Sequence, residues 1–426
     1  MARVLLQLSN PNNGVLLNRN YDPIDSKTGS NYLGADGAPL SGDETATAID
    51  EWAGYNPSVN SCYQQLGWSA PNLALTGTLA PGETYTILAY RYDKQKRTGT
   101  LLIEGNYKNI TSKVLVSMTI EPVMDNFPGV LVIDNWKGNS SGKLILRGRS
   151  IEGNRGNIYY PSLPSSNPAL TGISAPGDAT RPSYLDAIYS GPSDGATKDT
   201  VAGKMFACGL APTMAPTPQG TNLGVITTSQ TLSGAAGSIS YYQVDGINLT
   251  GFQTLTVDTT AGPVYIFYNG PIRLKNSAKI INVRTDGQPP KVGDLRFMSS
   301  SWTPQPDVRL ENTTCIQNAF LYSRYDDLEL LTSGAGCAGT NANFVGAAWV
   351  EGIISSKNAV SNRDVYYWGD DAEEFSSVLT ITGTLMPGTS GISIPDDLSS
   401  LVDLIDQINL PVKYKYTSIN NWQRLK

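Results

Sequence analysis

The sequence predicts a mainly β protein in which an antiparallel β domain is followed by a β-solenoid-like domain, that is, a parallel β-helix. Gly (42) and Pro (26) are abundant among the 426 residues, whereas charged residues make up only 16%. Short apolar or alternating runs lie between Gly- and Asn-containing corners, the pattern of strands separated by turns. A Gly followed by four residues, a basic residue and then Asn or Gly recurs at 142–148, 270–276 and 352–358. Such repetition is typical of stacked coils.

The first domain is predicted to comprise residues 1–125. Residues 10–70 are polar and rich in turn-forming residues, so we expect long loops there. Residues 73–123 contain runs such as ETYTILAYRYD and SKVLVSMTIEPV between short turn sequences. This part predicts an antiparallel meander of about four strands.

The second domain is predicted to comprise residues 126–394. Residues 161–240 are rich in Pro, Gly and Ser and are expected to form an extended insertion. From Ser240 onward, short strand-like runs alternate with Gly or Asn corners at fairly even spacing. Stacked coils would bury a ladder of aliphatic side chains. Because the spacing is only approximately regular, a Greek-key sandwich is the competing architecture.

Residues 395–426 are predicted to form a short C-terminal amphipathic helix and a tail strand. The sequence Pro395-Asp-Asp supplies an acidic N-terminal cap, and Pro411 ends the helix. Five apolar residues share one face of this helix: Leu398, Leu401, Val402, Ile405 and Ile408. The remaining residues alternate as a strand does.

Four cysteines, at Cys62, Cys208, Cys315 and Cys337, are the disulfide candidates. No Cys-x-x-Cys sequence occurs, which excludes a zinc ribbon or a thioredoxin motif. An even number in a chain of this composition indicates two disulfide bonds. Cys315–Cys337 is the favoured local pair and leaves Cys62 for Cys208, although sequence alone does not fix the connectivity.

The N-terminal residues offer no membrane span. No apolar run approaches the roughly 20 residues that cross a bilayer. Met1–Ser9 is too short for a signal peptide, although the remaining sequence has the composition of an exported protein. We expect Leu5, Leu6 and Leu8 to end a helix whose earlier turns precede residue 1.

The composition argues against most enzymes and against nucleic acid as a partner. The chain contains no histidine, the side chain most used for acid–base chemistry and metal ligation near neutral pH. No Gly-x-Ser-x-Gly sequence is present, so a serine hydrolase is not expected. The net charge of −6 disfavours binding to a phosphate backbone. We therefore predict a protein that is not an enzyme.

Two acidic clusters keep carboxylate chemistry open as an alternative. One covers 326–329, and the other contains Asp370, Asp371 and Glu373 beside Tyr366-Tyr-Trp. A glycosidase needs two carboxyl groups, and a calcium-dependent polysaccharide lyase uses acids with a basic residue. The favoured interpretation of the second cluster is a solvated turn. No cofactor is expected, and structural Ca²⁺ at Asp370, Asp371 and Glu373 is the alternative.

Three segments, 99–123, 130–158 and 241–283, carry a resemblance to a known group. They resemble the globular domain and the solenoid-like domain of PilX-type, type IV pilin-like surface proteins. The match is closest to the cyanobacterial group linked to hormogonium polysaccharide secretion and gliding. The resemblance implies a pilin-like first domain and an extracellular, cell-surface location. Members of this group begin with a prepilin-like hydrophobic helix. Residues 1–9 are expected to correspond at most to the last turns of such a helix.

We therefore expect an extracellular structural protein, the subunit of a cell-surface fibril or sheath that supports gliding motility and slime organisation. Copies of the chain would assemble through β-domain edges and through the C-terminal tail, which adds a strand to a neighbour. The tail residues expected to make this contact are Val412, Tyr414, Tyr416 and Trp422. Secreted polysaccharide is a further expected partner. The alternatives are a monomeric polysaccharide-binding adhesin or secretion accessory and the lyase.

Overall fold

The computed structural model describes residues 1–41, 44, 47–108, 110–124, 127–133, 151–153, 157–160, 205–208, 210–300, 308–331, 336–338, 343–351, 353–355, 392–394, 398–408 and 412–425. The chain forms two compact units. Unit 1 comprises Met1–Met124 with Leu410–Lys426, and unit 2 comprises Asp125–Asn409. Unit 2 is thus inserted into the chain of unit 1. The expected third domain, 395–426, is divided between them, because its tail completes the sheet of unit 1.

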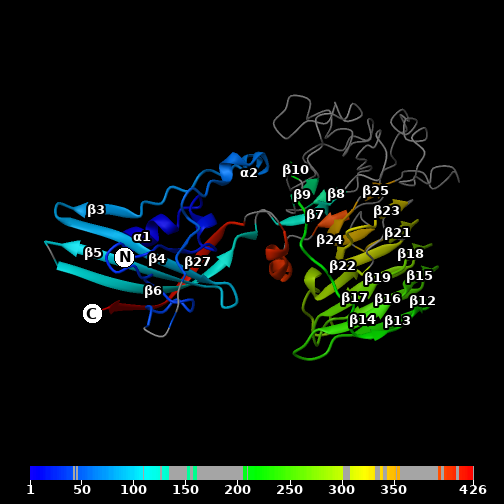
Figure 1. Ribbon diagram of the computed structural model, residues 1–426. Helices are drawn as coiled ribbons and strands as arrows, with labels where there is room; N and C mark the ends of the chain where they lie inside the picture. The colour runs from blue at the N-terminus through cyan, green and yellow to red at the C-terminus, as the bar shows by residue number, and fades with distance from the viewer. Residues whose placement is uncertain are drawn as a thin grey trace, which may run out of the picture. The chain divides into compact units, whose positions relative to one another are not determined.

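Unit 1 is built on an antiparallel sheet with the strand order β2-β1-β4-β5-β6-β27, and β3 also pairs with β4 (Figure 1). Its elements are α1 (Ala2–Leu8), η1 (Gly14–Leu16), β1 (Tyr21–Asp22), β2 (Ile49–Asp50), η2 (Pro57–Val59), α2 (Ser61–Gln65), β3 (Thr76–Ala80), β4 (Glu83–Asp93), β5 (Thr98–Tyr107), β6 (Ile110–Pro122) and β27 (Tyr414–Leu425). Strands β3 to β6 are the meander that the sequence predicts.

Both faces of this sheet are covered. On one face, Gln7 of α1 donates a hydrogen bond to the Tyr85 hydroxyl, and the Tyr90 hydroxyl donates to the carbonyl oxygen of Leu17 over 2.6 Å. On the other face, Leu33 belongs to a buried cluster with Leu88, Ala89, Leu102 and Leu115 of the central strands. Burial of each leucine in this cluster contributes about 1.5–3 kcal/mol. The sheet is therefore the centre of a layered core.

Unit 2 is a parallel β-solenoid, as predicted. Its elements are β7 (Pro128–Val132), β8 (Ile151–Gly153), β9 (Asn157–Tyr160), β10 (Met205–Ala207), β11 (Thr221–Asn222), β12 (Val225–Ile226), β13 (Gln230–Ser233), β14 (Ser240–Val244), β15 (Gly246–Thr250), β16 (Thr254–Asp258), β17 (Val264–Tyr268), β18 (Ile272–Lys275), β19 (Lys279–Val283), η6 (Val292–Asp294), β20 (Leu295–Ser299), β21 (Val308–Glu311), β22 (Cys315–Tyr322), β23 (Leu328–Leu331), β24 (Phe344–Val350), β25 (Ile353–Ser355), β26 (Ile392–Ile394) and η7 (Ser399–Gln407). Its named strands pair in parallel, for example β15 with β18 and β18 with β21. This pairing excludes the sandwich.

Aliphatic ladders fill the interior of the solenoid. Ile247, Ile272, Val308 and Leu328 lie side by side on β15, β18, β21 and β23, and each is fully buried. A second row two residues further along repeats the arrangement with leucines. Parallel strands in register bring like side chains together at each coil, so one continuous core results.

The order of the coils in space differs from their order in the chain. The sheet runs β10-β9-β7-β24-β22-β20-β17-β14-β11, so β7, early in the chain, stacks on β24, which comes late. Residues 210–220 then run back along the stack to the coil at the opposite end (Figure 1). On the way, the carbonyl oxygen of Met214 accepts a hydrogen bond from Tyr322. The expected extended insertion 161–240 is wrong for 205–240, which contains strands of the solenoid, and 161–204 lies outside the described residues.

Strands from two copies of the recurring pattern belong to one sheet of the solenoid. The second copy includes β18 and the third includes β25, and the first lies outside the described residues. Asn276 ends the second copy at a coil corner with a φ of 51°, in the left-handed region that Asn tolerates better than most residues. Asn312 occupies the next corner with a φ of 60° and donates a hydrogen bond to the Asn276 side chain.

The predicted amphipathic helix is present as the 3₁₀-helix η7, and its start at 395–397 lies outside the described residues. Leu398, Leu401, Ile405 and Ile408 are buried, and Val402 is half-buried. Arg296 of β20 holds η7 in place by donating two hydrogen bonds of 2.7 Å to the Asp403 carboxylate. The same guanidinium donates to the Ser400 carbonyl oxygen, so η7 is fixed by one buried arginine.

Candidate assembly surface

Strand β27 forms an edge of the unit 1 sheet. It pairs antiparallel with β6 from Tyr414, opposite Pro122, to Leu425, opposite Lys113, and among the described strands it has no second neighbour. Figure 1 shows it, in red, beside β6. The expectation that the tail adds to a neighbouring molecule is wrong for this side of the strand. The tail completes its own sheet, because β6 otherwise leaves an unpaired edge next to it.

Two bulges set the pattern of side chains along β27. On β6, Ile120, Met118 and Val116 follow one another at every second residue. Their partners on β27 are Tyr416, Ile419 and Trp422, which are three residues apart because the register shifts between each pair. Directly opposed residues point to the same face of a sheet. We call Tyr416, Ile419 and Trp422 the edge row.

The edge row continues a buried row of the sheet into solvent. Val116 lies opposite Leu101, which lies opposite Tyr90, and all three are fully buried. Trp422, next in this row, is 60% exposed, and Ile419 is 44% exposed. The edge row therefore faces the side of the sheet on which α1 and η1 lie, but Ile419 and Trp422 are left uncovered.

The other predicted tail residues have a different role. Val412 and Tyr414 are buried, and Tyr414 meets the ring of Tyr92 edge-on with centroids 6.1 Å apart. Lys413 lies over the ring of Trp68, and burial lowers the pKa of its ammonium group. The start of the tail thus belongs to the core of unit 1. Of the four predicted residues, Tyr416 is half-buried and Trp422 is exposed.

Polar side chains hold the bulges in place. The Asn420 side-chain oxygen accepts hydrogen bonds from the hydroxyls of Thr119 and Ser418, both over 3.0 Å. Near the end of the strand, Arg424 donates to the Ser112 hydroxyl over 2.8 Å. These contacts fix the bulges and so the spacing of the edge row. Ile419 was missed by sequence reasoning, because a bulge leaves no mark in a search for strict alternation.

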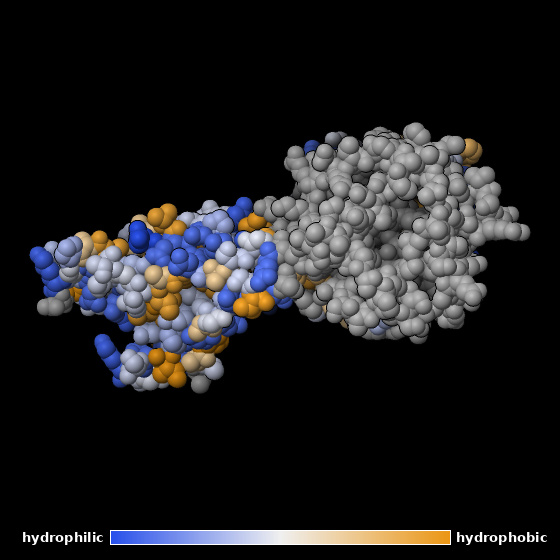
Figure 2. All heavy atoms as spheres, turned by 90° about the horizontal axis from the view of Figure 1, so that it is seen from above, coloured by the Kyte–Doolittle hydropathy of each residue, from blue (hydrophilic) through white to orange (hydrophobic). Residues whose placement is uncertain are grey.

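Apolar surface on unit 1 is divided among several places. Figure 2 shows separate hydrophobic patches on the visible face of this unit. Leu79 on β3 and Ile110 at the start of β6 are also exposed, at 53% and 65%. Single exposed apolar residues are normal on a protein surface. The edge row differs because its residues lie together on a strand whose outer backbone has no partner among the described strands.

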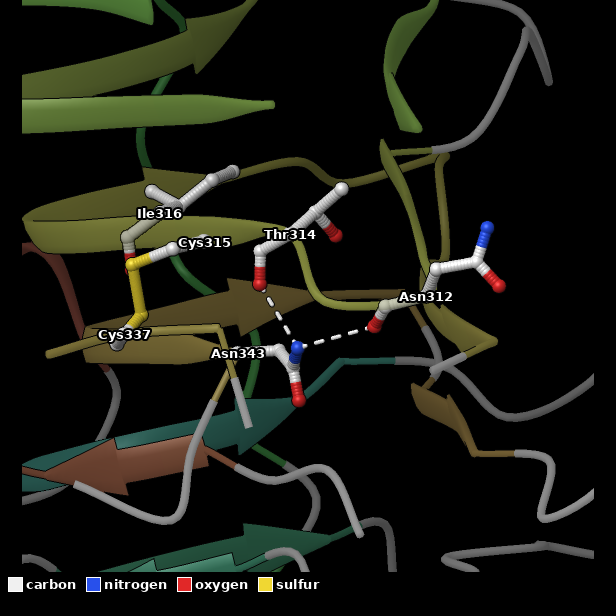
Figure 3. The surroundings of a disulfide bond; sticks show 6 residues. All are labelled: Asn312, Thr314, Cys315, Ile316, Cys337 and Asn343. Atoms are coloured by element: carbon white, nitrogen blue, oxygen red, sulfur yellow. Dashed lines mark hydrogen bonds between the residues drawn. A yellow bond between two sulfur atoms is a disulfide. The ribbon is translucent and has the colours of Figure 1, made fainter. Parts of the chain in front are cut away.

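A disulfide bond joins Cys315 to Cys337, the favoured local pair (Figure 3). Both residues are buried with Val345 in one small cluster. Beside them, the Asn343 side chain donates hydrogen bonds to the carbonyl oxygens of Thr314 and Asn312. The disulfide thus fastens the segment between β23 and β24 to the start of β22. None of the four cysteines is free, and the pairing of Cys62 with Cys208 stays a prediction.

Of the two acidic clusters, the structure describes only the one at 326–329. Asp370, Asp371 and Glu373 lie outside the described residues. In the other cluster, Asp326 is buried and accepts hydrogen bonds from the hydroxyls of Ser299 and Ser323, and Glu329 forms an ion pair with Arg309. Within the described ranges, no three Cys, Asp or Glu side chains form a group that could hold a metal ion.

In the part of the chain that the structure describes, no helix combines the length and apolar character that a bilayer crossing requires.

Comparisons with known proteins give little. No protein-family model and no curated protein matches the chain. Among solved structures, the chain is similar to the competence-associated pilin ComZ from Thermus thermophilus at 8% identity, over 84% of this chain and 89% of that one, with a TM-score of 0.18. A likeness at so low a TM-score carries no argument about fold or function. The resemblance to the cyanobacterial PilX-type group stays a prediction from the sequence.

Proposed function

We propose that this chain is a structural subunit, not an enzyme, and that copies of it join through the edge of the unit 1 sheet. The observation that supports the proposal is the edge row. Trp422 and Ile419 are 60% and 44% exposed and lie together on the described edge strand β27. Exposed apolar side chains beside unpaired backbone groups favour covering by another chain.

The proposed contact is addition of a strand. Backbone hydrogen bonds along β27 give affinity, and the edge row gives specificity through its side chains. The opposite side of the sheet offers a different edge strand, β3, with Leu79 exposed. Two unlike edges on one subunit allow a head-to-tail contact that repeats, and a repeated contact extends into a fibril.

The location and biological role belong to the same proposal. Two features support an extracellular structural protein: the Cys315–Cys337 disulfide, typical of oxidising compartments, and the absence of histidine from the sequence. A fibril or sheath that supports gliding, with secreted polysaccharide as a partner, follows from the resemblance of the sequence. Neither a cofactor nor Ca²⁺ is required by this function.

The test is the assembly state of the double variant Ile419→Ser/Trp422→Ser. We expect the unchanged protein to sediment as large species and to form regular fibrils in electron micrographs, and the double variant to lose them. Ile110→Ser is the matched control, because it removes an exposed aliphatic side chain from β6 outside the residues that pair with β27. Deleting the tail is unsuitable, since β27 covers the edge of β6.

Two results would count against the proposal. Fibrils that persist in the double variant would show that the edge row is not the contact. A monomeric unchanged protein that binds secreted polysaccharide would favour the adhesin.

A further inference from the structure

Residues 221–233 form the coil at one end of the described stack of unit 2. Strands β11, β12 and β13 each pair with a single strand, β14, β15 and β16, among the strands described. We call residues 221–233 the open coil. Solenoid proteins ordinarily cap such an end, because its backbone N–H and C=O groups match those of another strand.

The open coil lacks the charges that normally protect a sheet edge. Residues 205–244 contain no Asp, Glu, Lys or Arg. The coils that follow carry Asp258, Arg273, Lys275 and Lys279 on their strands. Charged side chains, lysine above all, are the usual means by which an exposed edge avoids pairing with another chain. The open coil has no such means.

Apolar side chains are exposed at the same end of the stack. Val225 of β12 is 54% exposed. Phe252, at the corner between β15 and β16 of the adjacent coil, is 91% exposed. The two coils are directly joined there, since the Thr254 amide donates a hydrogen bond to the Ser229 hydroxyl. Unpaired backbone and exposed apolar groups thus occur together.

We infer that the open coil is an interface with the open coil of a second copy of this chain. Two identical ends meet through a two-fold axis, which makes the paired strands of the two copies antiparallel. Across such an axis, a charged residue of the open coil would lie near the same residue of the second copy. Like charges at an interface oppose association. The open coil has no charged residue and therefore fits this arrangement. The contact lies in unit 2 and is independent of the edge row.

The test uses a lysine on the open coil and a matched lysine one coil away. Thr231 and Thr256 are register partners on β13 and β16, so Thr231→Lys and Thr256→Lys place the same charge at the same point of successive coils. Both are made in the Ile419→Ser/Trp422→Ser background, which removes assembly through the edge row. We expect the background protein and Thr256→Lys to sediment as dimers. Thr231→Lys should raise the dissociation constant at least about 100-fold, since like charges brought together cost several kcal/mol.

Hydrogen exchange checks the site without a substitution in the solenoid. In the background protein, amides of 221–233 should exchange more slowly at concentrations at which the dimer forms, whereas amides of β18 should not change. A monomeric background protein, equal weakening by both lysines, or exchange in 221–233 that does not depend on concentration would overturn the inference. The two proposals fail separately, because Thr231 and Thr256 lie in unit 2, whereas Ile419 and Trp422, which are replaced in this background, lie in unit 1.

Discussion

Asp22 is a fully buried carboxylate whose partners are spread over distant parts of unit 1. It accepts hydrogen bonds from the backbone amides of Tyr32 and Leu33, and it forms an ion pair of 2.8 Å with Arg91. Arg91 also donates to the carbonyl oxygens of Leu33 and Thr47. One ion pair therefore ties the 21–47 loop region to the centre of the sheet.

Replacing Arg91 with Met is expected to destabilise unit 1 by about 3–5 kcal/mol, because it leaves the buried Asp22 carboxylate without its counter-charge. Urea unfolding followed by tryptophan fluorescence measures this. Lys96→Met is the control, since Lys96 pairs with Asp93 at the surface, where such a pair contributes about 0–1 kcal/mol. Equal effects of the two substitutions would show that the buried pair does not stabilise the unit.

At the scale of elements, the segment between β23 and β24 depends on its disulfide. Cys315 and Cys337 are 22 residues apart in the sequence. Closing a loop of that length stabilises a fold by about 3 kcal/mol, chiefly by restricting the unfolded chain. The double variant Cys315→Ala/Cys337→Ala should lower the free energy of unfolding of unit 2 by that amount. Circular dichroism in a urea titration measures it, and an unchanged midpoint would contradict the estimate.

The sequence predicts elements well where their signals are local. The meander of β3 to β6, the parallel coils and the Cys315–Cys337 pair follow from alternation, corner residues and short separation. The edge row was predicted in part, because bulges place Ile419 and Trp422 on one face at a spacing of three. The stacking of β7 on β24 was missed, since pairing between segments so far apart leaves no local pattern.

Across the whole molecule, buried tyrosines predict loss of stability at high pH. Burial raises the pKa of Tyr265 and of Tyr322 to about 12, and raises the pKa values of Tyr90 and Tyr268 well above 10. In the unfolded chain these phenols ionise near pH 10. Between about pH 10 and 12 the unfolded chain therefore releases protons that the folded chain keeps, which lowers the free energy of unfolding.

Urea titrations at intervals from pH 8 to 11.5 measure this effect, and stability should be level below about pH 9.5 and fall above it. The absorbance of tyrosinate at 295 nm supplies the control, because exposed phenols should ionise before the buried ones. A constant free energy of unfolding up to pH 11.5 would contradict the assigned pKa shifts.

If copies of this chain assemble as a structural subunit does, electron microscopy of the protein purified without denaturant will show the assemblies. We expect regular fibrils with a constant repeat that disappear when Ile419 and Trp422 are both replaced with Ser. Dispersed single molecules at every concentration, for the unchanged protein, would contradict this expectation.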